Sequence, residues 1–361
     1  MTGKIETLAK QLPLAADGGK VDALLVTSEV NRRYLTGFSS SAGMVLVTAE
    51  EGYFLTDSRY EEAARAKIRH CEVLGYERAF SALKILFEKH GVRRVAVERK
   101  EMSLADFSRY QSYFTEYSFD ASPLLDGLLR DMRAIKSPDE LAKLRQAQEI
   151  TEAAYRHILP RIQPGVAEQD LALELEFFMR KNGAESVAFD LIVVSGAKSS
   201  MPHGVPDGKL VEKGDFVTMD TGAVVGGMHA DMTRTVAVGA VTAEQREVYD
   251  IVLRAQLAAI AAVCDGVPCS EVDRAAREVI ARAGYGPCFG HSTGHSVGFE
   301  IHEEPNFSPA SADIARSGMV ITVEPGIYLP GRFGVRTEDM VLVTPDGCQN
   351  LTRAPKELVI L

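Results

Sequence analysis

Three histidines lie close together in residues 289–305, which read FGHSTGHSVGFEIHEEP. They are His291, His295 and His302. The same stretch contains GHSTG, residues 290–294, which fits the G-x-S-x-G pattern of a serine-hydrolase nucleophile elbow. One interpretation makes Ser292 the nucleophile, and the other assigns the chemistry to the histidines. The two interpretations predict different enzymes.

The nucleophile elbow requires a strand before the serine and a helix after it, with an acid and then a histidine further along the chain. Ser292 is followed by His295, Ser296 and Gly298, which are poor helix material, and no acid lies between Ser292 and His295. The surroundings of Ser292 therefore disfavour a serine hydrolase.

Two other short motifs also resemble catalytic signatures. Residues 220–222 spell the Asp-Thr-Gly of aspartic proteases, but that mechanism needs two such carboxylates and the chain has one copy. Residues 291–295 have the spacing of the H-E-x-x-H zinc helix, but they lack its glutamate and place Gly294 inside the turn. Neither motif supports its enzyme class.

Two aspartates stand on opposite sides of Gly226-Gly227, in DFVTMDTGAVV and MHADMTRTVAVG. A two-residue turn at these glycines places Asp220 opposite Thr233 and Asp231 opposite Gly222, so both carboxylates share one face of a hairpin. A register shift of one residue would separate them. If buried, the pair would need a cation; if exposed, or paired with Arg234, it would need none.

Three further candidate ligands lie in the same half of the chain: His295, Glu324 in ITVEPG and Glu338 in VRTEDM. Four carboxylates and one imidazole are mostly hard oxygen donors, which suit Mn, Co or Fe better than a thiolate-bound structural zinc. Because carboxylates can bridge, five residues suffice for two metals that activate water for attack on a carbonyl. The set predicts a metal-dependent hydrolase.

The elements that must position these residues differ between the two halves. In the first half, the segments DALLVTS, GMVLVT, GYFLT and RRVAVE predict strands. SRYEEAARAKI and SALKILFEKH have helical spacing, and Ser58 with Glu61 predicts a capping box. Strands alternating with helices indicate an α/β domain.

The alternation of strands and helices ends near RDMRAIKSPDE, and we place a domain boundary after residue 127. Ser137, Pro138 and Glu140 predict a capped helix that runs towards Ile158. Further helices are expected over residues 168–182 and 243–264. The strand pair around Gly226-Gly227 and a second pair around PGRFG read as hairpins, so the catalytic half looks like two similar helix-plus-hairpin units.

Composition limits the class of protein. The chain has 361 residues, 46% hydrophobic and 25% charged, which is ordinary for a globular protein of about two domains. A net charge of -10 with no basic stripe argues against nucleic acid or an anionic membrane as partner. Five scattered cysteines and an N-terminus without an apolar core segment predict a cytoplasmic protein with reduced thiols.

The order of the motifs resembles the pita-bread metallopeptidases, specifically the aminopeptidase P and prolidase branch. The resemblance rests on MPHG, TMDTG, HADMTRT, STGHSVGFEIHEEP, TVEPGIYLPG and GVRTEDM, and in the first domain on NRRYLTGFSSSAG and LTDSRYEEA. It implies a creatinase-type α/β domain over residues 1–127 and an α+β pita-bread catalytic domain over residues 128–361.

The resemblance also implies roles for individual residues. The ligands of two divalent metals, with Mn expected and Co, Fe or Zn as alternatives, would be Asp220, Asp231, His295, Glu324 and Glu338. Glu324 would also accept a proton from the attacking water. The substrate site would be lined by His203, His291 and His302, with His302 and His203 steadying the tetrahedral intermediate, and Arg336 would belong to its polar network.

The implied reaction is hydrolysis of the Xaa-Pro bond in proline-containing peptides. An aminopeptidase P would release the N-terminal residue from longer peptides, whereas a prolidase would act on the dipeptide and must recognise the proline carboxylate, for which an arginine is suited. Some prolidases place an arginine shortly after the HE-x-P segment, where this chain has Asn306-Phe307. That difference favours the aminopeptidase, although Arg332 or an arginine of a partner subunit would reverse it.

Other classes stay open at this point. Methionine aminopeptidases share the catalytic fold but usually lack a domain like residues 1–127. Creatinase-like relatives lose the ligands, and a metal-binding, non-catalytic relative is a remote alternative. By resemblance we also expect a homodimer.

Replacing Ser292 and His295 separately tests which interpretation of the opening stretch is correct. Ser292→Ala should retain most activity because the serine is a small residue in a glycine-rich turn. His295→Ala should lose bound metal and activity together, because it removes the one nitrogen ligand. Metal analysis and peptidase assays on both variants measure this, and an inactive Ser292→Ala with full metal content would restore the serine nucleophile.

Overall fold

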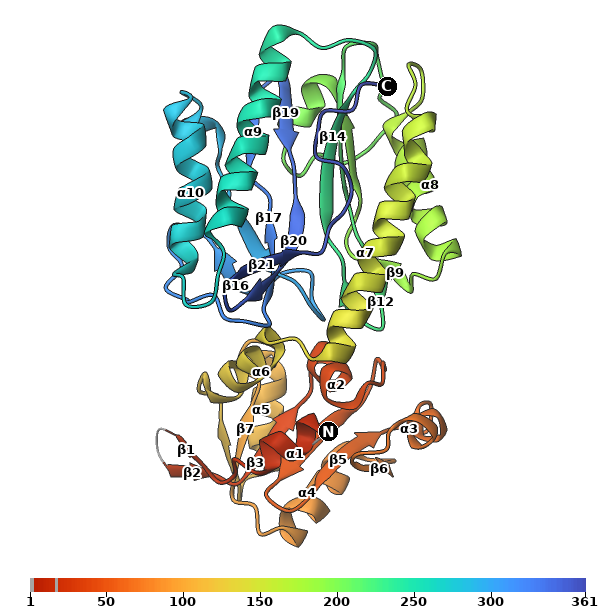
Figure 1. Cartoon of the computed structure of the whole chain (residues 1–361). Helices are drawn as coiled ribbons and strands as arrows, with labels where there is room; N and C mark the ends of the chain where they lie inside the picture. Colours follow the sequence, from red (N-terminus) through yellow and green to blue (C-terminus); the bar gives the residue numbers. More distant parts are fainter. Residues whose placement is uncertain (1–2, 17–18) are drawn as a thin grey trace. The chain divides into compact units, whose positions relative to one another are not determined.

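A computed structural model describes residues 3–16 and 19–361 of the chain. The chain divides between Arg133 and Ala134 into two compact units. Figure 1 colours it from red at the N-terminus to blue at the C-terminus. Helix α6 (Leu124–Ala134) spans the position after residue 127 where the sequence suggested a boundary. The division comes at the end of this helix, just before the cap of the next one.

The first unit is built on a six-stranded mixed sheet with the order β6-β5-β4-β3-β7-β8. Its strands are β3 (Ala23–Val26), β4 (Met44–Thr48), β5 (Gly52–Thr56), β6 (Glu72–Gly75), β7 (Arg94–Val97) and β8 (Ser118–Asp120). Its helices are α1 (Lys4–Ala9), α2 (Glu29–Thr36), α3 (Glu61–Lys67), α4 (Ala79–Lys89), α5 (Leu104–Tyr113) and α6; β1 (Leu14–Ala16) and β2 (Gly19–Val21) form a separate small hairpin. The four predicted strands and the α/β class are confirmed.

The predicted capping box at the start of α3 is wrong. The residue before the helix is Tyr60, which has helical backbone angles and makes no side-chain cap. Glu61 instead accepts hydrogen bonds from Arg65, one turn along the helix. Ser58 lies in the preceding turn, where the Tyr60 and Glu61 N–H groups donate to the Asp57 carbonyl. A backbone carbonyl thus satisfies a donor that the capping pattern assigned to a serine.

The second unit contains two pairs of long helices and the strands that follow each pair. The first set is α7 (Pro138–Ile158), α8 (Glu168–Lys181), β9 (Ser186–Val187), β10 (Ile192–Ser195), β11 (Phe216–Thr221), β12 (Ala223–Val225), β13 (Met228–His229) and β14 (Met232–Ala237). The second set is α9 (Ala243–Ala262), α10 (Cys269–Arg282), β15 (Gly294–Ser296), β16 (Glu303–Phe307), β17 (Val320–Val323), β18 (Gly326–Leu329), β19 (Phe333–Arg336), β20 (Asp339–Thr344) and β21 (Gly347–Asn350). Sequence reasoning found every long helix of this unit except α10.

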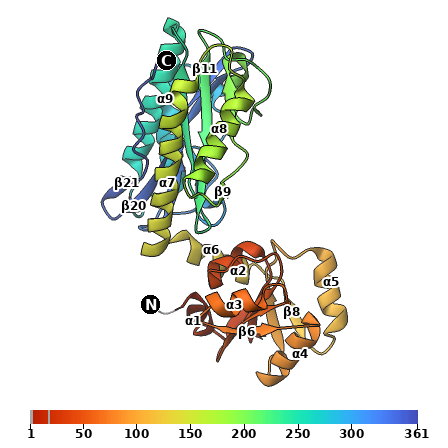
Figure 2. The same ribbon diagram turned by 90° about the vertical axis from the view of Figure 1, so that its right-hand side faces the viewer.

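Each helix pair packs on its own set of strands. Residues of α7 and α8 form a core with β10, β11 and β14, and residues of α9 and α10 form another with β17, β18, β19 and β20. Figures 1 and 2 show α7 and α8 side by side along the strands, and Figure 1 shows α9 and α10 on their other side. The helix-plus-hairpin pattern that the sequence suggested is therefore present twice.

The first hairpin has the predicted register. Asp220 pairs with Thr233, and the pairs Thr221–Met232 and Val224–His229 continue the same register on either side of Asp231. Gly226 and Gly227 both have positive φ, at 59° and 81°, as a tight two-residue hairpin turn requires. Asp220 and Asp231 are therefore diagonal neighbours on one face.

The second hairpin repeats this arrangement around the PGRFG turn. Val323 pairs with Asp339, and Gly326 pairs with Arg336. The two pairs share one register although they belong to different sheets, so Glu324 and Glu338 stand opposite each other at the break between the sheets. Each hairpin thus carries two acids, which are diagonal neighbours in the first hairpin and directly opposite each other in the second.

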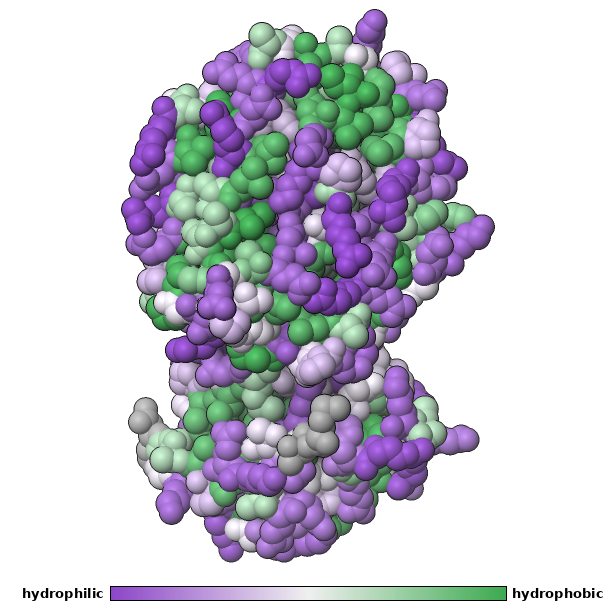
Figure 3. Space-filling view, viewed as in Figure 1, coloured by the Kyte–Doolittle hydropathy of each residue, from purple (hydrophilic) through white to green (hydrophobic). Residues whose placement is uncertain are grey.

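Hydrophilic and hydrophobic side chains are interspersed on the face shown in Figure 3. Among the described residues, no helix is both long enough and apolar enough to span a bilayer.

The cap of α7 offers a test of the helix that opens the second unit. Ser137 Oγ accepts from the Glu140 N–H at 3.3 Å, and Glu140 Oε2 accepts from the Ser137 N–H at 2.8 Å, completing the predicted capping box. Ser137→Ala should lower the free energy of unfolding by about 1 kcal/mol because one buried helix N–H loses its acceptor. Urea unfolding measures this; an unchanged midpoint would show that the cap contributes nothing. Thr242→Ala, at the equivalent cap of α9, is the matched control and should behave alike.

Candidate metal centre

Five predicted ligands come from five strand ends of the second unit. Asp220 lies on β11 and Asp231 directly before β14, while His295 lies on β15. Glu324 follows β17 and Glu338 precedes β20. The Glu338 N–H donates to the Thr233 carbonyl at 3.1 Å, which joins the first hairpin to the second. Folding therefore brings together residues that are up to 118 positions apart in the sequence, between Asp220 and Glu338.

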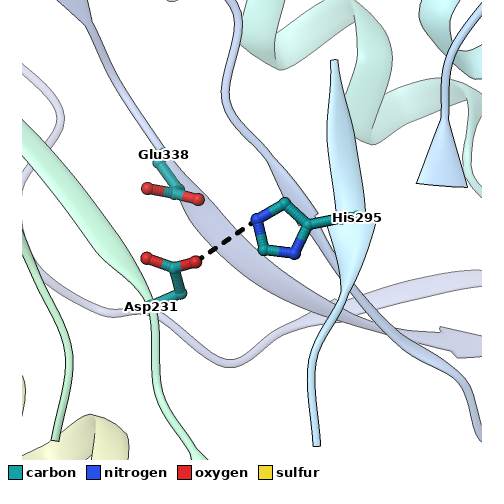
Figure 4. A group of neighbouring side chains, drawn as sticks. All are labelled: Asp231, His295 and Glu338. Atoms are coloured by element: carbon teal, nitrogen blue, oxygen red, sulfur yellow. Dashed lines mark ion pairs between the residues drawn. The ribbon is translucent and has the colours of Figure 1, made fainter. Parts of the chain in front are cut away.

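Three of these side chains form a group that can hold a metal ion. Asp231, His295 and Glu338 each offer one ligand atom, and the three atoms lie within 4.8 Å of one another. Figure 4 shows their polar ends turned towards one another, and its dashed line joins His295 Nε2 to Asp231 Oδ2 at 3.5 Å. Glu324 Oε1 lies 3.3 Å from the same His295 nitrogen.

The site opens into one cavity of about 900 Å³. Every predicted site residue lines it: His203, Asp220, Asp231, His291, His295, His302, Glu324, Arg336 and Glu338. Its wall also includes the apolar residues Val187, Phe189, Leu191 and Ile301. An apolar pocket with a few convergent polar groups is the usual form of a small-molecule or peptide site.

The donor atoms fit a cation. Asp231 is 3% exposed and Glu338 is 1% exposed, so neither carboxylate has bulk water around it. Asp220 Oδ1 and Glu338 Oε1 are buried and have no hydrogen-bond partner among the described residues. Buried carboxylate oxygens are costly to leave unpaired, and oxygen ligands with one imidazole suit divalent first-row metals. The residues present therefore match the expected metal pair.

The pKa values of the acids show the same electrostatic conflict. Burial, followed by the neighbouring Glu338 and Asp220, raises the pKa of Asp231 well above its usual range. Burial raises the pKa of Glu324 to about 8. Burial together with Glu324 and Asp220 also raises the pKa of Glu338. Without a metal, protons would have to neutralise this cluster.

The surroundings of His295 favour a neutral imidazole that could bind a metal ion. Its Nδ1 lies 3.2 Å from the Ser296 carbonyl, which accepts only, so Nδ1 carries the proton and Nε2 presents a lone pair to Asp231 and Glu324. Burial and the neighbouring His302 lower the pKa of His295 to about 4. A lone pair facing two carboxylates needs either a proton or a metal ion between them.

Arg336 is the counter-charge that directly contacts these acids. Its Nη2 donates to Asp220 Oδ2 at 2.7 Å, its Nε donates to Thr233 Oγ1 at 3.0 Å, and its Nη1 donates to Tyr328 Oη at 2.8 Å. Nη1 also reaches the Pro202 carbonyl at 3.2 Å. Arg336 thus connects the segment carrying His203 to the aspartate at the centre.

Arg234 does not neutralise the aspartates, as one interpretation of the sequence allowed. Its guanidinium pairs with Asp339 at 2.7 Å and donates to the carbonyl of Glu338 at 2.6 Å. The side chain is fully buried, and its hydrogen bonds hold the Glu338 backbone in place on the side away from the cavity. The reason is strand alternation, because Arg234 points to the opposite face from its neighbour Thr233.

The three histidines predicted to line the substrate site differ in how many of their ring nitrogens are already hydrogen-bonded. His291 has both ring nitrogens engaged, Nδ1 at 2.8 Å from the Ser292 carbonyl and Nε2 at 2.9 Å from Tyr328 Oη. Burial, followed by Arg336, lowers the pKa of His291 to about 4, so the ring is neutral. His203 and His302 are exposed in the cavity. His302 packs against His295, with ring centroids 4.5 Å apart.

Sequence reasoning missed the residues that support this site. Tyr328 bridges His291 and Arg336 from β18. On α10, the buried Asp273 pairs with the half-buried Arg277. Asp273 accepts from Thr293 Oγ1 at 2.9 Å, and Arg277 donates to the His291 carbonyl at 2.9 Å. The spacing of Asp273 and Arg277, one helical turn apart, is a signal for an ion pair, but it does not indicate a loop 20 residues away. Tyr328 carries no such signal.

Comparison with known proteins agrees with this geometry. The family model for metallopeptidase family M24 matches residues 142–345, and the model for the creatinase/prolidase N-terminal domain matches residues 10–135. The chain belongs to metallopeptidase family M24. It is therefore a metallopeptidase, and the pita-bread fold expected from the sequence is confirmed. The five predicted ligands converge within the matched residues 142–345.

The chain is similar to Xaa-Pro peptidases along nearly its whole length. It is 41% identical to an Xaa-Pro dipeptidase structure from Bacillus anthracis, with a TM-score of 0.91, covering 94% of this chain and 95% of that one. It is 37% identical to an X-Pro aminopeptidase structure from Thermotoga maritima, with a TM-score of 0.89 and coverage of 94% and 98%. The curated Xaa-Pro dipeptidase of Pyrococcus horikoshii is 36% identical, over 95% of this chain and 96% of that protein.

The raised carboxyl pKa values predict how the metal-free M24 site depends on pH. The folded state holds protons on these acids that the unfolded state has already lost, so unfolding free energy falls as pH rises. The lowered pKa values of His291 and His295 act in the opposite sense, but only below their ordinary value of 6.5. Between pH 6.5 and about 8 the raised carboxyl pKa values therefore determine how stability changes with pH. Glu324 alone should lower the free energy of unfolding by about 1–2 kcal/mol over this range.

Urea unfolding of chelator-treated protein across this pH range measures the effect. Glu324→Gln is the control, because it removes one titrating acid and should flatten the decrease. A free energy of unfolding that stays constant or rises between pH 6.5 and 8 in the metal-free wild type would contradict the prediction.

Proposed function

We propose that this chain is a dinuclear metal-dependent Xaa-Pro dipeptidase. The convergence of the five ligands on one cavity carries the proposal, in a chain that matches proteins named Xaa-Pro dipeptidase along almost their full length. The sequence difference at Asn306-Phe307 favoured the aminopeptidase instead. The relatives support the dipeptidase better, and we adopt it as the main function.

Two divalent cations would be held by Asp220, Asp231, His295, Glu324 and Glu338. Mn is the expected metal, with Co, Fe or Zn as alternatives that the same donors accept. Bound there, the metals supply Lewis acidity for the attack of water on the peptide carbonyl. The unpartnered oxygens of Asp220 and Glu338, buried among the described residues, support their role as ligands.

Glu324 is proposed as the proton acceptor for the attacking water. It lies at the cavity wall within 3.3 Å of His295 Nε2, and burial raises its pKa to about 8 in the metal-free site, which supports a role in accepting a proton. A general base is most effective when its pKa lies near the working pH. Metal binding will lower that pKa, so the balance between ligand and base depends on the metals present.

The other polar residues have distinct proposed roles. His203 and His302 are exposed in the cavity, which suits them to steady the tetrahedral intermediate or to donate towards the proline nitrogen. His291, whose ring is engaged with Tyr328, orients that tyrosine and through it Arg336. Arg336 holds Asp220 in place as a metal ligand.

An aminopeptidase acting on longer Xaa-Pro peptides is the second candidate. A dipeptidase must bind the free carboxylate of proline, and Arg336 is the one arginine or lysine among the described residues that line the cavity. All three of its guanidinium nitrogens already donate to protein groups. Asn306 lines the cavity on β16 without adding a positive charge, and Phe307 is buried in the core.

We also propose a cytoplasmic homodimer, as the resemblance to the family implies. All five cysteines are free thiols, which fits a reducing compartment. In a dimer, a cation from the partner could complete the carboxylate site of a dipeptidase.

Cleavage of Ala-Pro and Ala-Pro-Ala by the purified protein tests the proposed function. We expect faster cleavage of Ala-Pro with added Mn or Co, complete loss with a chelator, and recovery when the metal is restored, because the metals supply the Lewis acid. Ala-Ala is the control substrate and should be cleaved poorly. Faster cleavage of Ala-Pro-Ala would establish the second candidate, and cleavage of neither peptide by metal-loaded protein would exclude both.

A further inference from the structure

The loop that carries His302 has no regular structure of its own. It covers residues 297–302, between β15 and β16, and we call it the His302 loop. His302 is exposed at its end, while its ring stands 4.5 Å from the ring of His295. A side chain that must meet a substrate from such a loop needs the loop to be held in one position.

A buried carboxylate fills the inside of this loop. The Glu303 side chain is 4% exposed, and its Oε1 accepts from the Glu300 N–H at 3.3 Å. A Cβ placed on Gly298 would lie 2.5 Å from both carboxylate oxygens, so the backbone at Gly298 approaches them as closely as a glycine allows. The loop is therefore folded around the Glu303 carboxylate.

The partner of this carboxylate comes from far away in the sequence. Lys136 Nζ donates to Glu303 Oε2 at 3.0 Å, and the lysine side chain is 1% exposed. The Lys136 backbone is itself fixed, because its N–H donates to the Gly318 carbonyl at 2.9 Å. The pair thus ties the His302 loop to the segment directly before the Ser137 cap of α7.

A buried ion pair is a poor way to gain stability. Removing two charges from water costs several kcal/mol, and apolar side chains of similar volume often stabilise a protein as well or better. What the pair provides is a fixed contact for the loop, because two charges buried to this degree must stay together. The carboxylate also stands beside a site that already holds four acids, so leaving it uncompensated would disturb that site as well.

We propose that Lys136 and Glu303 are positioning residues that set the place of His302 in the active site. Both act through the backbone of the His302 loop, which the Glu303 carboxylate organises and the Lys136 ammonium anchors. The inference rests on the proposed function, in which His302 meets the substrate. It adds to that function a residue, Lys136, that lies outside the motifs on which the family resemblance rests.

Lys136→Met tests the proposal by leaving the loop without its anchor. We expect kcat on the Xaa-Pro substrate to fall by about 10- to 100-fold, with KM changed by less than about threefold and the metal content unchanged. Amide hydrogen exchange in residues 297–303 of the metal-free protein should rise by at least about tenfold, with no change in β10 and β11. Unchanged exchange in the loop, or a kcat within twofold of wild type, would overturn the proposal.

The double variant Lys136→Met with Glu303→Gln separates positioning from stability. A neutral glutamine can stay buried without a counter-charge, so the melting temperature should recover towards wild type while kcat stays low. If the melting temperature and kcat recovered together, the pair would have only a structural role and the proposal would be overturned. Ile158→Ala, in the core at the far end of α7, is the matched control for lost stability and should leave kcat within twofold when assayed well below its melting temperature.

The hydrogen-exchange measurement needs no substrate. If wild-type protein cleaves no Xaa-Pro peptide, the proposed function fails, yet the exchange of the His302 loop in Lys136→Met still decides whether the pair holds that loop.

Discussion

The structure of the second unit depends on a concentration of negative charge that water does not solvate. Asp231 and Glu338 are almost completely buried, and Asp220 and Glu324 lie beside them. Burial, together with the neighbouring negative charges, raises the pKa values of Asp231, Glu324 and Glu338. Arg336 compensates Asp220, but the remaining acids need cations or protons. A polypeptide keeps such a cluster only when the surrounding fold holds it firmly.

The fold holds the cluster by bringing backbones very close together. A Cβ on Gly222 would lie 1.9 Å from the Ala230 carbonyl oxygen, and one on Gly294 would lie 1.8 Å from the Thr322 oxygen. Behind the acids, Arg234 binds carbonyl oxygens and Asp339, so the strand carrying Glu338 is fixed on the side away from the cavity. Metal-binding sites need this kind of support because ligand geometry tolerates little movement.

The two hairpins make equivalent contributions to the second unit. Each follows a pair of long helices, each has its own apolar core, and each supplies two acids to the site. His295 comes from a strand of the second sheet that pairs with both β16 and β17. The loops around it are anchored from outside, through Asp273 and Arg277 on one side and through Lys136 and Glu303 on the other. The predicted metal ligands therefore lie on or beside strands, whereas His291 and His302 lie on loops held by these contacts.

The sequence by itself determined the local features whose causes lie within a few residues. The two glycines fix the turn and hence the register that puts Asp220 and Asp231 on one face, and Ser137 with Glu140 fixes the start of α7. It also predicted which acids share one cavity with His295, because an acid inside an apolar strand needs a cation or a hydrogen-bonded partner to be buried there. Ser58 shows the limit of such reasoning, since a backbone carbonyl took the place of its side chain.

Only the tertiary structure decided which distant groups meet. Lys136 and Glu303 are 167 residues apart, and Arg336 and Asp220 are 116 apart, so no local pattern relates them. Tertiary packing also decided that Arg234 faces away from the acids and that the ring of His291 is engaged. Burial is the physical reason, because the charge state of a carboxylate and the partner it requires depend on the water that folding removes from it.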